Sequence, residues 1–213
     1  MLYSRYKNEY DSPMFVLMID TTCANLTVAV ADEQHICAEH QQMMARGQAE
    51  QLMGTLQSVL DQAQKTLQDI QAIVVNVGPG SFTGVRIGLA TARALGLALN
   101  IPVWGVTAFE VYAYGVNMPT AVVLESLRDD IYVQTFNAQG QAEDEPHICA
   151  PEDVPALPLR GSAAERVAAV TGDQIYPATC SLSQAMARIA FARKDAPLPP
   201  NPMYVRDADV SLA

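Results

Sequence analysis

The pattern of apolar and polar positions in the first half of the chain predicts three short strands followed by a helix. Apolar runs at residues 14–20, 26–31 and 35–41 are separated only by short polar turns, which is typical of an antiparallel meander. From residue 46 to 64 the apolar side chains recur instead at helical spacing, at Leu52, Met53, Leu56, Val59, Leu60 and Ala63. A one-sided apolar stripe of this kind packs against a sheet.

Strands and helices alternate beyond this helix. We expect a buried strand over residues 72–77, a small-residue helix that ends near Asn100, a strand over 101–106 and a helix over 107–116. The order is three strands, a helix, a strand, a helix, a strand and a helix. It predicts an α/β unit in which a mixed sheet joins the meander to parallel strands.

The second half of the chain is less regular. Its pattern predicts a hairpin over residues 120–126 and 130–137, at most short strands over the acidic stretch 138–160, helices over 161–170 and 182–194, and an extended proline-rich tail over 197–207.

We expect three parts along the chain. Residues 1–13 are polar and predict a flexible leader, residues 14–106 an N-terminal subdomain, and residues 107–213 a shortened C-terminal subdomain.

Composition and charge narrow the function classes. Half of the 213 residues are apolar, which excludes a globally disordered chain. The net charge of −10 argues against a free-standing nucleic-acid binder, which carries a basic face. The sequence has no secretory apolar segment and no uninterrupted apolar run of about 18 residues. We therefore expect a cytoplasmic protein with no membrane contact.

A glycine-rich turn between the strand at 72–77 and the following helix is the most informative motif. Gly78 and Gly80 allow backbone conformations closed to other residues, and Ser81 or Thr83 can cap the helix. One interpretation is a cradle of backbone N–H groups for an anion, with Arg86 nearby. The alternative is a tight strand-to-helix turn that binds nothing. The turn is not a P-loop, because no Gly-Lys-Ser/Thr closes it.

Asp20 and Thr21 end the first strand and are candidates for the same anion or nucleotide site. In actin-like ATPases, the corresponding hairpin also carries a glycine that lets backbone amides approach phosphate. This chain has no glycine before Asn25, which argues against a standard ATP site.

The helix after the turn carries a ridge of small residues, Gly84, Gly88, Ala92 and Gly96. A second row of small residues follows it at Ala90, Ala94 and Ala98. Each glycine costs a helix about 1 kcal/mol relative to alanine, so close approach of another backbone is the expected compensation. The neighbour is the helix at 46–64, the sheet, or a helix of a partner protein.

The sequence shows no metal-ligand spacing and no hydrolase motif. It has no H-x-x-x-H and no C-x-x-C among its histidines and cysteines, His35, His40, His147, Cys23, Cys37, Cys149 and Cys180. The serine in the turn is not in a G-x-S-x-G elbow. We expect no metal site, no catalytic residue and no cofactor of the chain's own.

Four stretches together resemble the TsaB (YeaZ) family. They are the Gly78–Gly88 run G-P-G-S-F-T-G-V-R-I-G, the pair Asp20-Thr21, the strand I-P-V-W-G-V at 101–106, and P-M-Y-V-R at 202–206. The resemblance implies an actin/Hsp70-like (ASKHA) α/β fold. Such a fold has two related subdomains, each with a mixed β-sheet packed by helices, and in this family a degenerate nucleotide site.

The resemblance also implies a function. TsaB-like proteins are non-catalytic subunits that pair with a TsaD-like catalytic subunit and work with a TsaE-like ATPase. Together they install threonylcarbamoyl on adenosine 37 of tRNAs that read codons beginning with A. ATP and metal are then expected in the partner subunits, and tRNA would bind through the complex only.

The family pairs through the two helices of its first half. We therefore assign to the partner interface the helix-face residues Glu50, Leu52, Met53, Leu56, Gly84, Gly88, Ala92 and Gly96. A homodimer through the same helices is the alternative.

The chain departs from the family pattern at a few positions. Gln48 stands where members often have histidine, and Glu125 and Asp130 replace the usual aspartate and glutamate around Arg128. Two other function classes stay open, a glycoprotease-like peptidase and a small actin-like ATPase. The missing H-x-x-x-H argues against the first, and the hairpin without a glycine argues against the second.

Overall fold

The computed structural model describes residues 13–22, 25–44, 46–126 and 128–205. The predicted leader over residues 1–13 lies outside this part of the chain, except for Pro13.

A five-stranded mixed sheet forms the first layer of the molecule. Its strands are β1 (Phe15–Asp20), β2 (Asn25–Ala31), β3 (Ile36–Met43), β4 (Ile70–Asn76) and β5 (Val103–Val106), in the order β3-β2-β1-β4-β5. The first three strands pair antiparallel, whereas β4 runs parallel to both β1 and β5. The predicted meander with parallel strands beside it is confirmed.

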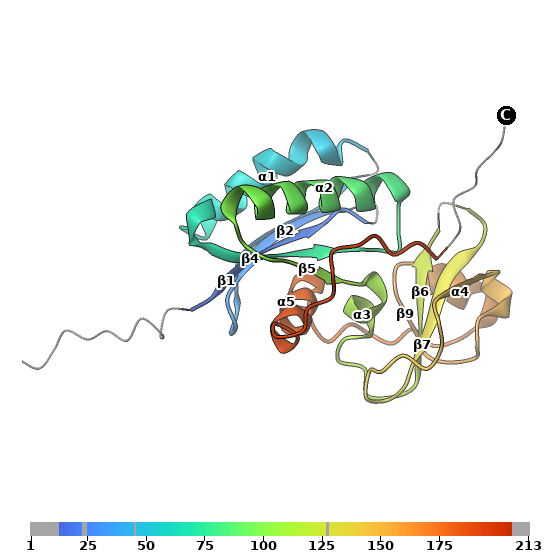
Figure 1. Ribbon diagram of the computed structural model, residues 1–213. Helices are drawn as coiled ribbons and strands as arrows, with labels where there is room; N and C mark the ends of the chain where they lie inside the picture. The colour runs from blue at the N-terminus through green and yellow to red at the C-terminus, as the bar shows by residue number, and fades with distance from the viewer. Residues whose placement is uncertain (1–12, 23–24, 45, 127, 206–213) are drawn as a thin grey trace, which may run out of the picture.

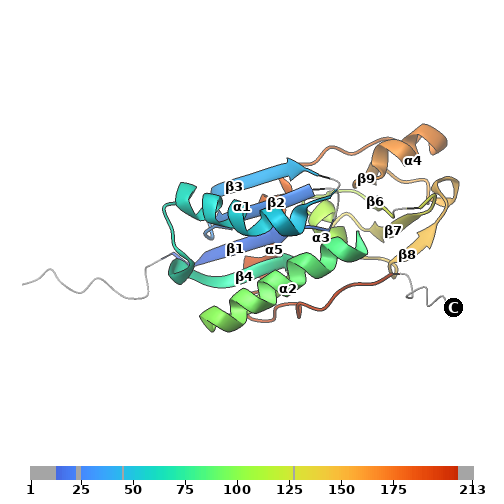
Figure 2. The same cartoon turned by 90° about the horizontal axis from the view of Figure 1, so that it is seen from above.

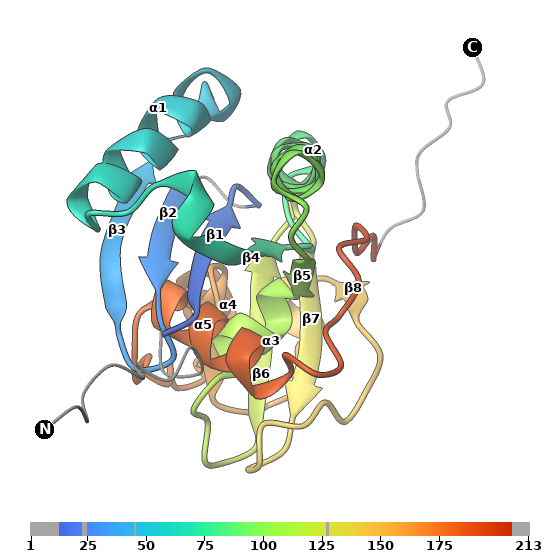
Figure 3. The same ribbon diagram turned by 60° about the vertical axis from the view of Figure 1, so that its left-hand side comes forward.

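Helices α1 (Gln48–Gln62) and α2 (Phe82–Leu99) cover one face of this sheet (Figure 1). The apolar stripe of α1 packs on the sheet as its spacing predicts. Leu52, Leu56, Val59 and Leu60 are buried in one cluster with β1, β2 and β4. Figure 3 shows the two helices side by side above the strands.

The opposite face is covered by helices from the second half of the sequence, α3 (Ala108–Ala113) and α5 (Leu182–Ala192). Met186 and Ala187 of α5 are buried in a cluster with Val16 and Met18 of β1. The core of the first sheet is therefore completed by a helix more than 160 residues further along the chain than β1.

A second, smaller sheet stands beside the first. Its order is β8-β7-β6-β9, and it includes the parallel pair β6/β9 and the antiparallel pairs β6/β7 and β7/β8. Helix α4 (Ala164–Thr171) packs on it. The strands are β6 (Thr120–Glu125), β7 (Ile131–Phe136), β8 (His147–Cys149) and β9 (Leu159–Arg160), and short 3-10 turns lie at Leu67–Asp69 and Pro151–Asp153. The predicted α/β class, with two mixed sheets packed by helices, is confirmed.

The extended tail returns along the edge of the first sheet. The Gly105 N–H donates to the Leu198 carbonyl at 2.7 Å, and the Met203 N–H donates to the Val77 carbonyl at 2.8 Å. From α2, Arg93 donates to the Pro200 carbonyl at 2.5 Å. Figure 2 shows this segment beside α2, so the tail shields β5 and the end of β4.

Candidate functional site

The predicted anion site lies where β1 and β4 end side by side. The Asp20 carboxylate accepts hydrogen bonds from the Thr22 backbone N–H at 2.8 Å and from its hydroxyl at 2.7 Å. Its second oxygen accepts from the Asn76 amide at 2.9 Å, and the Asn76 side-chain oxygen accepts from the Gly78 N–H at 3.0 Å. These bonds lock the two strand ends together.

The glycine-rich turn is packed directly onto the chain after β1. The Ser81 N–H donates to the Thr22 carbonyl at 2.6 Å, and the Ser81 hydroxyl caps α2 by accepting from the Gly84 N–H at 3.3 Å. A Cβ atom at Gly80 or Gly84 would overlap the carbonyl oxygen of Thr22 or Thr21. Because these two glycines have no side chain, the backbone of Thr21 and Thr22 lies directly against the turn. This backbone occupies the space of the predicted anion cradle.

Arg86 does not face this turn. Its guanidinium lies 3.6 Å from the centroid of the Phe82 ring, and its Nε donates to the Tyr204 hydroxyl at 3.2 Å, on the exposed side of α2. Thr83 is exposed as well. The structure thus brings together Asp20, Thr21, Gly78, Gly80 and Ser81 but leaves Arg86 outside. This geometry favours the tight turn over the anion cradle.

The small-residue ridge of α2 faces the chain's own sheet. A Cβ at Gly88 would lie 2.7 Å from the Thr21 hydroxyl, a Cβ at Gly96 would overlap the Val103 side chain, and Ala92 is fully buried. On α1, Leu52 and Leu56 are each only 1% exposed.

Six of the eight residues that we assigned to a partner interface therefore pack inside the chain. They are Leu52, Leu56, Gly84, Gly88, Ala92 and Gly96. We correct the assignment for these six, because their side chains or backbone already contact the sheet. Glu50 and Met53 are exposed and stay candidates.

An exposed apolar surface lies on the outer side of the same two helices. We call it the α1/α2 face and define it by Glu50, Met53 and Gly54 of α1 and by Ala90, Ala94, Leu97 and Ala98 of α2. Leu97 is 86% exposed and Met53 51% exposed. A Cβ at Gly54 would meet no neighbouring atom.

Helix α2 is unusually apolar for a surface helix. Within the part of the chain that the structure describes, it alone is long and apolar enough to cross a membrane, and 33% of it is buried. Val85, Leu89 and Ala92 of this helix are buried in the core, and its exposed apolar residues in the α1/α2 face are Ala90, Ala94, Leu97 and Ala98.

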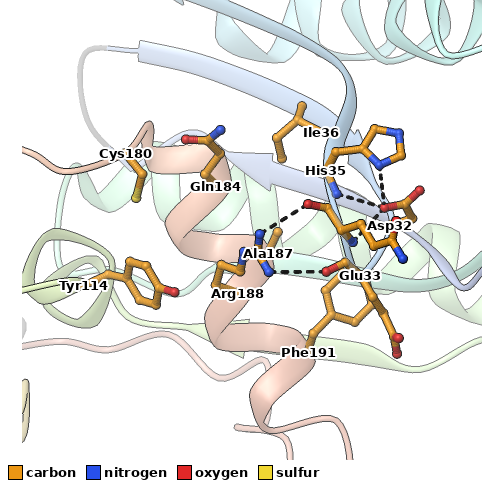
Figure 4. A pocket seen from close by; sticks show the side chains of 11 residues that line it. Asp32, Glu33, His35, Ile36, Tyr114, Cys180, Gln184, Ala187, Arg188 and Phe191 are labelled. Atoms are coloured by element: carbon orange, nitrogen blue, oxygen red, sulfur yellow. Dashed lines mark hydrogen bonds and ion pairs between the residues drawn. The ribbon is translucent and has the colours of Figure 1, made fainter.

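The turn between β2 and β3 gathers residues that the sequence analysis did not connect. Asp32, His35 and Cys37 place their ligand-type atoms within 4.8 Å of one another. Burial, followed by the nearby Asp32 carboxylate, raises the pKa of the Cys37 thiol. A pocket of about 180 Å³ lies beside this turn, between it and α5 (Figure 4). The spacing D-x-x-H-x-C was the available signal.

Comparison with known proteins shows the family to which this chain belongs. The family model for TsaD, tRNA N6-adenosine threonylcarbamoyltransferase, matches residues 13–194. The chain belongs to this family. Within the family, it is similar to proteins named TsaB and to a solved structure named YeaZ.

Relatives match over about nine-tenths or about half of the chain. An uncharacterized protein of Mycobacterium tuberculosis (strain H37Rv) is 34% identical over 199 residues, which cover 91% of this chain and 92% of that protein. The tRNA threonylcarbamoyladenosine biosynthesis protein TsaB of Bacillus subtilis is 36% identical over 100 residues, covering 47% of this chain and 44% of that protein. TsaB of Escherichia coli is 34% identical over 102 residues, covering 48% and 44%.

The fold matches two solved structures over about nine-tenths of this chain. YeaZ from Pseudomonas aeruginosa superposes with a TM-score of 0.71 at 23% identity, covering 90% of this chain and 99% of that chain. A protein described as similar to peptidase YeaZ, from the same organism, gives a TM-score of 0.75 at 23% identity, covering 91% and 100%. These two structures establish the fold expected from the TsaB (YeaZ) resemblance.

Proposed function

We propose that this chain is a non-catalytic, cytoplasmic TsaB-like subunit of tRNA threonylcarbamoyladenosine synthesis, and that the α1/α2 face binds a TsaD-like catalytic partner. Family membership and the named TsaB relatives support the pathway. The exposed apolar face of α2 is the observation that carries the proposed binding role.

The face has the shape and chemistry of a helix-packing surface. Ala90, Ala94 and Ala98 form an exposed row of small side chains along α2, and small residues let a second helix approach closely. Leu97 projects next to this row and is exposed to water. Burying a leucine side chain is more favourable than leaving it exposed by roughly 2 kcal/mol. Covering this surface with two helices of a partner would bury it.

The remaining features agree with a subunit that leaves chemistry to its partners. The predicted anion turn is filled by the chain's own Thr21 and Thr22, and the sequence lacks the H-x-x-x-H expected in the catalytic subunit. The net charge of −10 is unfavourable for binding tRNA alone. We infer that ATP and catalytic metal belong to the TsaE-like and TsaD-like partners, and that tRNA is held by the assembled complex.

A substitution in the α1/α2 face tests the interface. Leu97→Arg places a charge on the most exposed apolar side chain of the face, near the end of α2, and we expect it to weaken binding to the TsaD-like protein of the same organism at least tenfold, or by about 1.4 kcal/mol. Val170→Arg is the matched control, because Val170 is also apolar, helical and 57% exposed but lies on α4. Titration calorimetry measures both. Equal affinities for the two variants would refute the proposed interface.

A reconstitution tests the function itself. The TsaD-like and TsaE-like proteins are combined with unmodified tRNA and the substrates of the reaction, with and without this chain, and modified adenosine is counted by mass spectrometry. We expect modification only when this chain is present, and none from this chain alone. Full modification without it would refute the subunit role. If this chain forms a homodimer that persists in Leu97→Arg but is lost in Val170→Arg, the chain self-associates through the surface around α4 and not through the α1/α2 face.

A further inference from the structure

The turn between β2 and β3 carries three side chains of the types that bind transition metals. Their ligand atoms lie within 4.8 Å of one another, and Asp32 is buried, Cys37 half-buried and His35 exposed. The Asp32 Oδ1 and His35 Nδ1 atoms are 3.0 Å apart. Because one member is exposed, an ion can reach the cluster from solvent.

Two backbone features aim these side chains at one point. The Asp32 Oδ1 atom also accepts hydrogen bonds from the backbone N–H groups of Gln34 at 2.8 Å and His35 at 2.9 Å, which fixes the carboxylate inside the turn. In addition, the β2/β3 pairing passes from Ala31↔Ile36 to Val30↔Ala38, so Cys37 is the extra residue of a β-bulge. A bulge redirects the side chain that it adds, here to the same place as the Asp32 carboxylate.

The turn is anchored from the opposite side by α5. Arg188 donates to the carbonyl oxygens of Glu33 at 3.4 Å and Gln34 at 3.2 Å (Figure 4). Just after α5, Lys194 pairs with the Glu33 carboxylate at 2.9 Å. Ile36 packs into the core that α5 shares with the sheet. These contacts hold the turn in place without using the three metal-type side chains, so the cluster is built on a supported scaffold.

We propose that Asp32, His35 and Cys37 form a binding site for one divalent transition-metal ion of the zinc class. Carboxylate, imidazole and thiolate together are a donor set that suits Zn²⁺, whereas Mg²⁺ and Ca²⁺ take oxygen ligands. On binding, the thiol loses its proton to solvent and its sulfur becomes a ligand. The thiolate and carboxylate then balance the two positive charges of the ion, and water fills the fourth position.

The geometry is close to what the ion needs. With zinc bonds of about 2.0–2.3 Å, ligand atoms of a tetrahedral site lie roughly 3.3–3.6 Å apart. The oxygen–nitrogen pair, at 3.0 Å, is already near this value. The widest separation allowed by the cluster, 4.8 Å, requires a closure of roughly 1 Å. Rotation of the exposed imidazole and of the half-buried thiol supplies such a movement without shifting the backbone.

This site is independent of the proposed subunit function. It lies on the β2/β3 turn, where Cys37 packs against the core cluster beneath α1 and α2, whereas the α1/α2 face is the exposed outer side of these two helices. A bound ion would fasten the start of β3 to the end of β2. It would also raise the melting temperature in proportion to the logarithm of free metal above its dissociation constant.

The test uses the full chain without an affinity tag. Zn²⁺ affinity is measured by competition with a chromophoric chelator, and Co²⁺ is added separately, because thiolate ligation gives a sulfur-to-metal charge-transfer band. We expect one ion per chain and this band in the unaltered protein. Cys37→Ser and His35→Ala should each weaken Zn²⁺ binding at least tenfold, and Cys37→Ser should abolish the band.

The matched controls are Cys149→Ser and His147→Ala. Cys149 is also half-buried, and His147 also pairs with an aspartate, Asp144, at 3.9 Å. Both controls should keep full affinity and the Co²⁺ band. Since His35 is exposed, its replacement leaves the fold intact and gives a second reading should Cys37→Ser unfold. Absence of binding in the unaltered protein, or binding that survives both Cys37→Ser and His35→Ala, would overturn the proposal.

Discussion

Two helical glycines in different surroundings give opposite predictions for the same substitution. Gly84 lies at the start of α2, against the backbone after β1, whereas Gly54 lies in the middle of α1 and faces open space. We expect Gly84→Ala to destabilise the protein and Gly54→Ala to stabilise it. The pair separates the packing effect of a new methyl group from its effect on the helix.

The magnitudes follow from the contacts. A methyl group at Gly84 would overlap the Thr21 carbonyl, which is backbone and cannot rotate away. The required shift also strains the bond from the Thr21 hydroxyl to the Gly84 carbonyl at 2.7 Å, so overpacking and this bond together cost roughly 2–4 kcal/mol. The gain in helix propensity is about 1 kcal/mol and applies to both glycines. The net change is therefore a loss of about 1–3 kcal/mol for Gly84→Ala and a gain of about 1 kcal/mol for Gly54→Ala.

Thermal unfolding followed by far-UV circular dichroism measures both variants. In a chain of this length, each kcal/mol shifts the melting temperature by about 2–4 °C, so the two variants should differ by roughly 4–16 °C. If Gly84→Ala is as stable as Gly54→Ala, α2 does not press on Thr21. The small-residue ridge would then be open to a partner, as the family resemblance first implied.

Three further predictions concern single contacts. Glu110→Gln removes an ion pair with Arg193 at 2.5 Å that joins α3 to the end of α5. Urea unfolding should show that the free energy of unfolding falls by about 1 kcal/mol. An unchanged free energy of unfolding would mean that solvent fully screens the pair. Hydrogen bonds from the backbone and hydroxyl of Thr66 lower the pKa of Asp69. Its stabilising effect is therefore present above the usual aspartate pKa, about 3.9, and is lost as pH falls through the lowered value. Asp69→Asn should flatten that part of an acid-unfolding curve, and an unchanged curve would contradict this. Burial, followed by neighbouring carboxylates, raises the pKa of the Cys149 thiol. Iodoacetamide should therefore modify Cys149 more slowly in the folded chain than in urea, because the thiolate is the reactive form. Equal rates of modification would contradict a raised pKa.

Local patterns in the sequence predicted most of the elements. Helix α1 and the first strands follow from apolar spacing, because burial of one face imposes a period on the residues themselves. The cap of α2 by Ser81 and the strand-to-helix turn also followed from local residue types. Helix α5 was predicted as a helix, but its spacing does not state which sheet it covers.

The neighbours of the α2 ridge could not be predicted in the same way. A glycine every fourth residue shows that some backbone comes close, yet Thr21 is 63 residues from Gly84 and no local signal connects them. The resemblance to the TsaB (YeaZ) family led us to assign residues on the inner faces of two helices to an interface, and six of these residues pack inside the chain. Likewise, the bulge at Cys37 depends on the register of two strands, so the spacing D-x-x-H-x-C by itself does not show that the three side chains meet.

The late position of α5 has a consequence for how the protein is made. All five strands of the first sheet have been synthesised by residue 106, yet α5, which completes the cover of their second face, ends at residue 192. Until then, the apolar side chains that pack against Met186, including Val16 and Met18, have no lasting cover on that side. At about 5–20 residues per second, this interval lasts roughly 4–17 seconds. Nascent chains stalled within it should bind a chaperone that recognises apolar strands, and chains released after α5 should not.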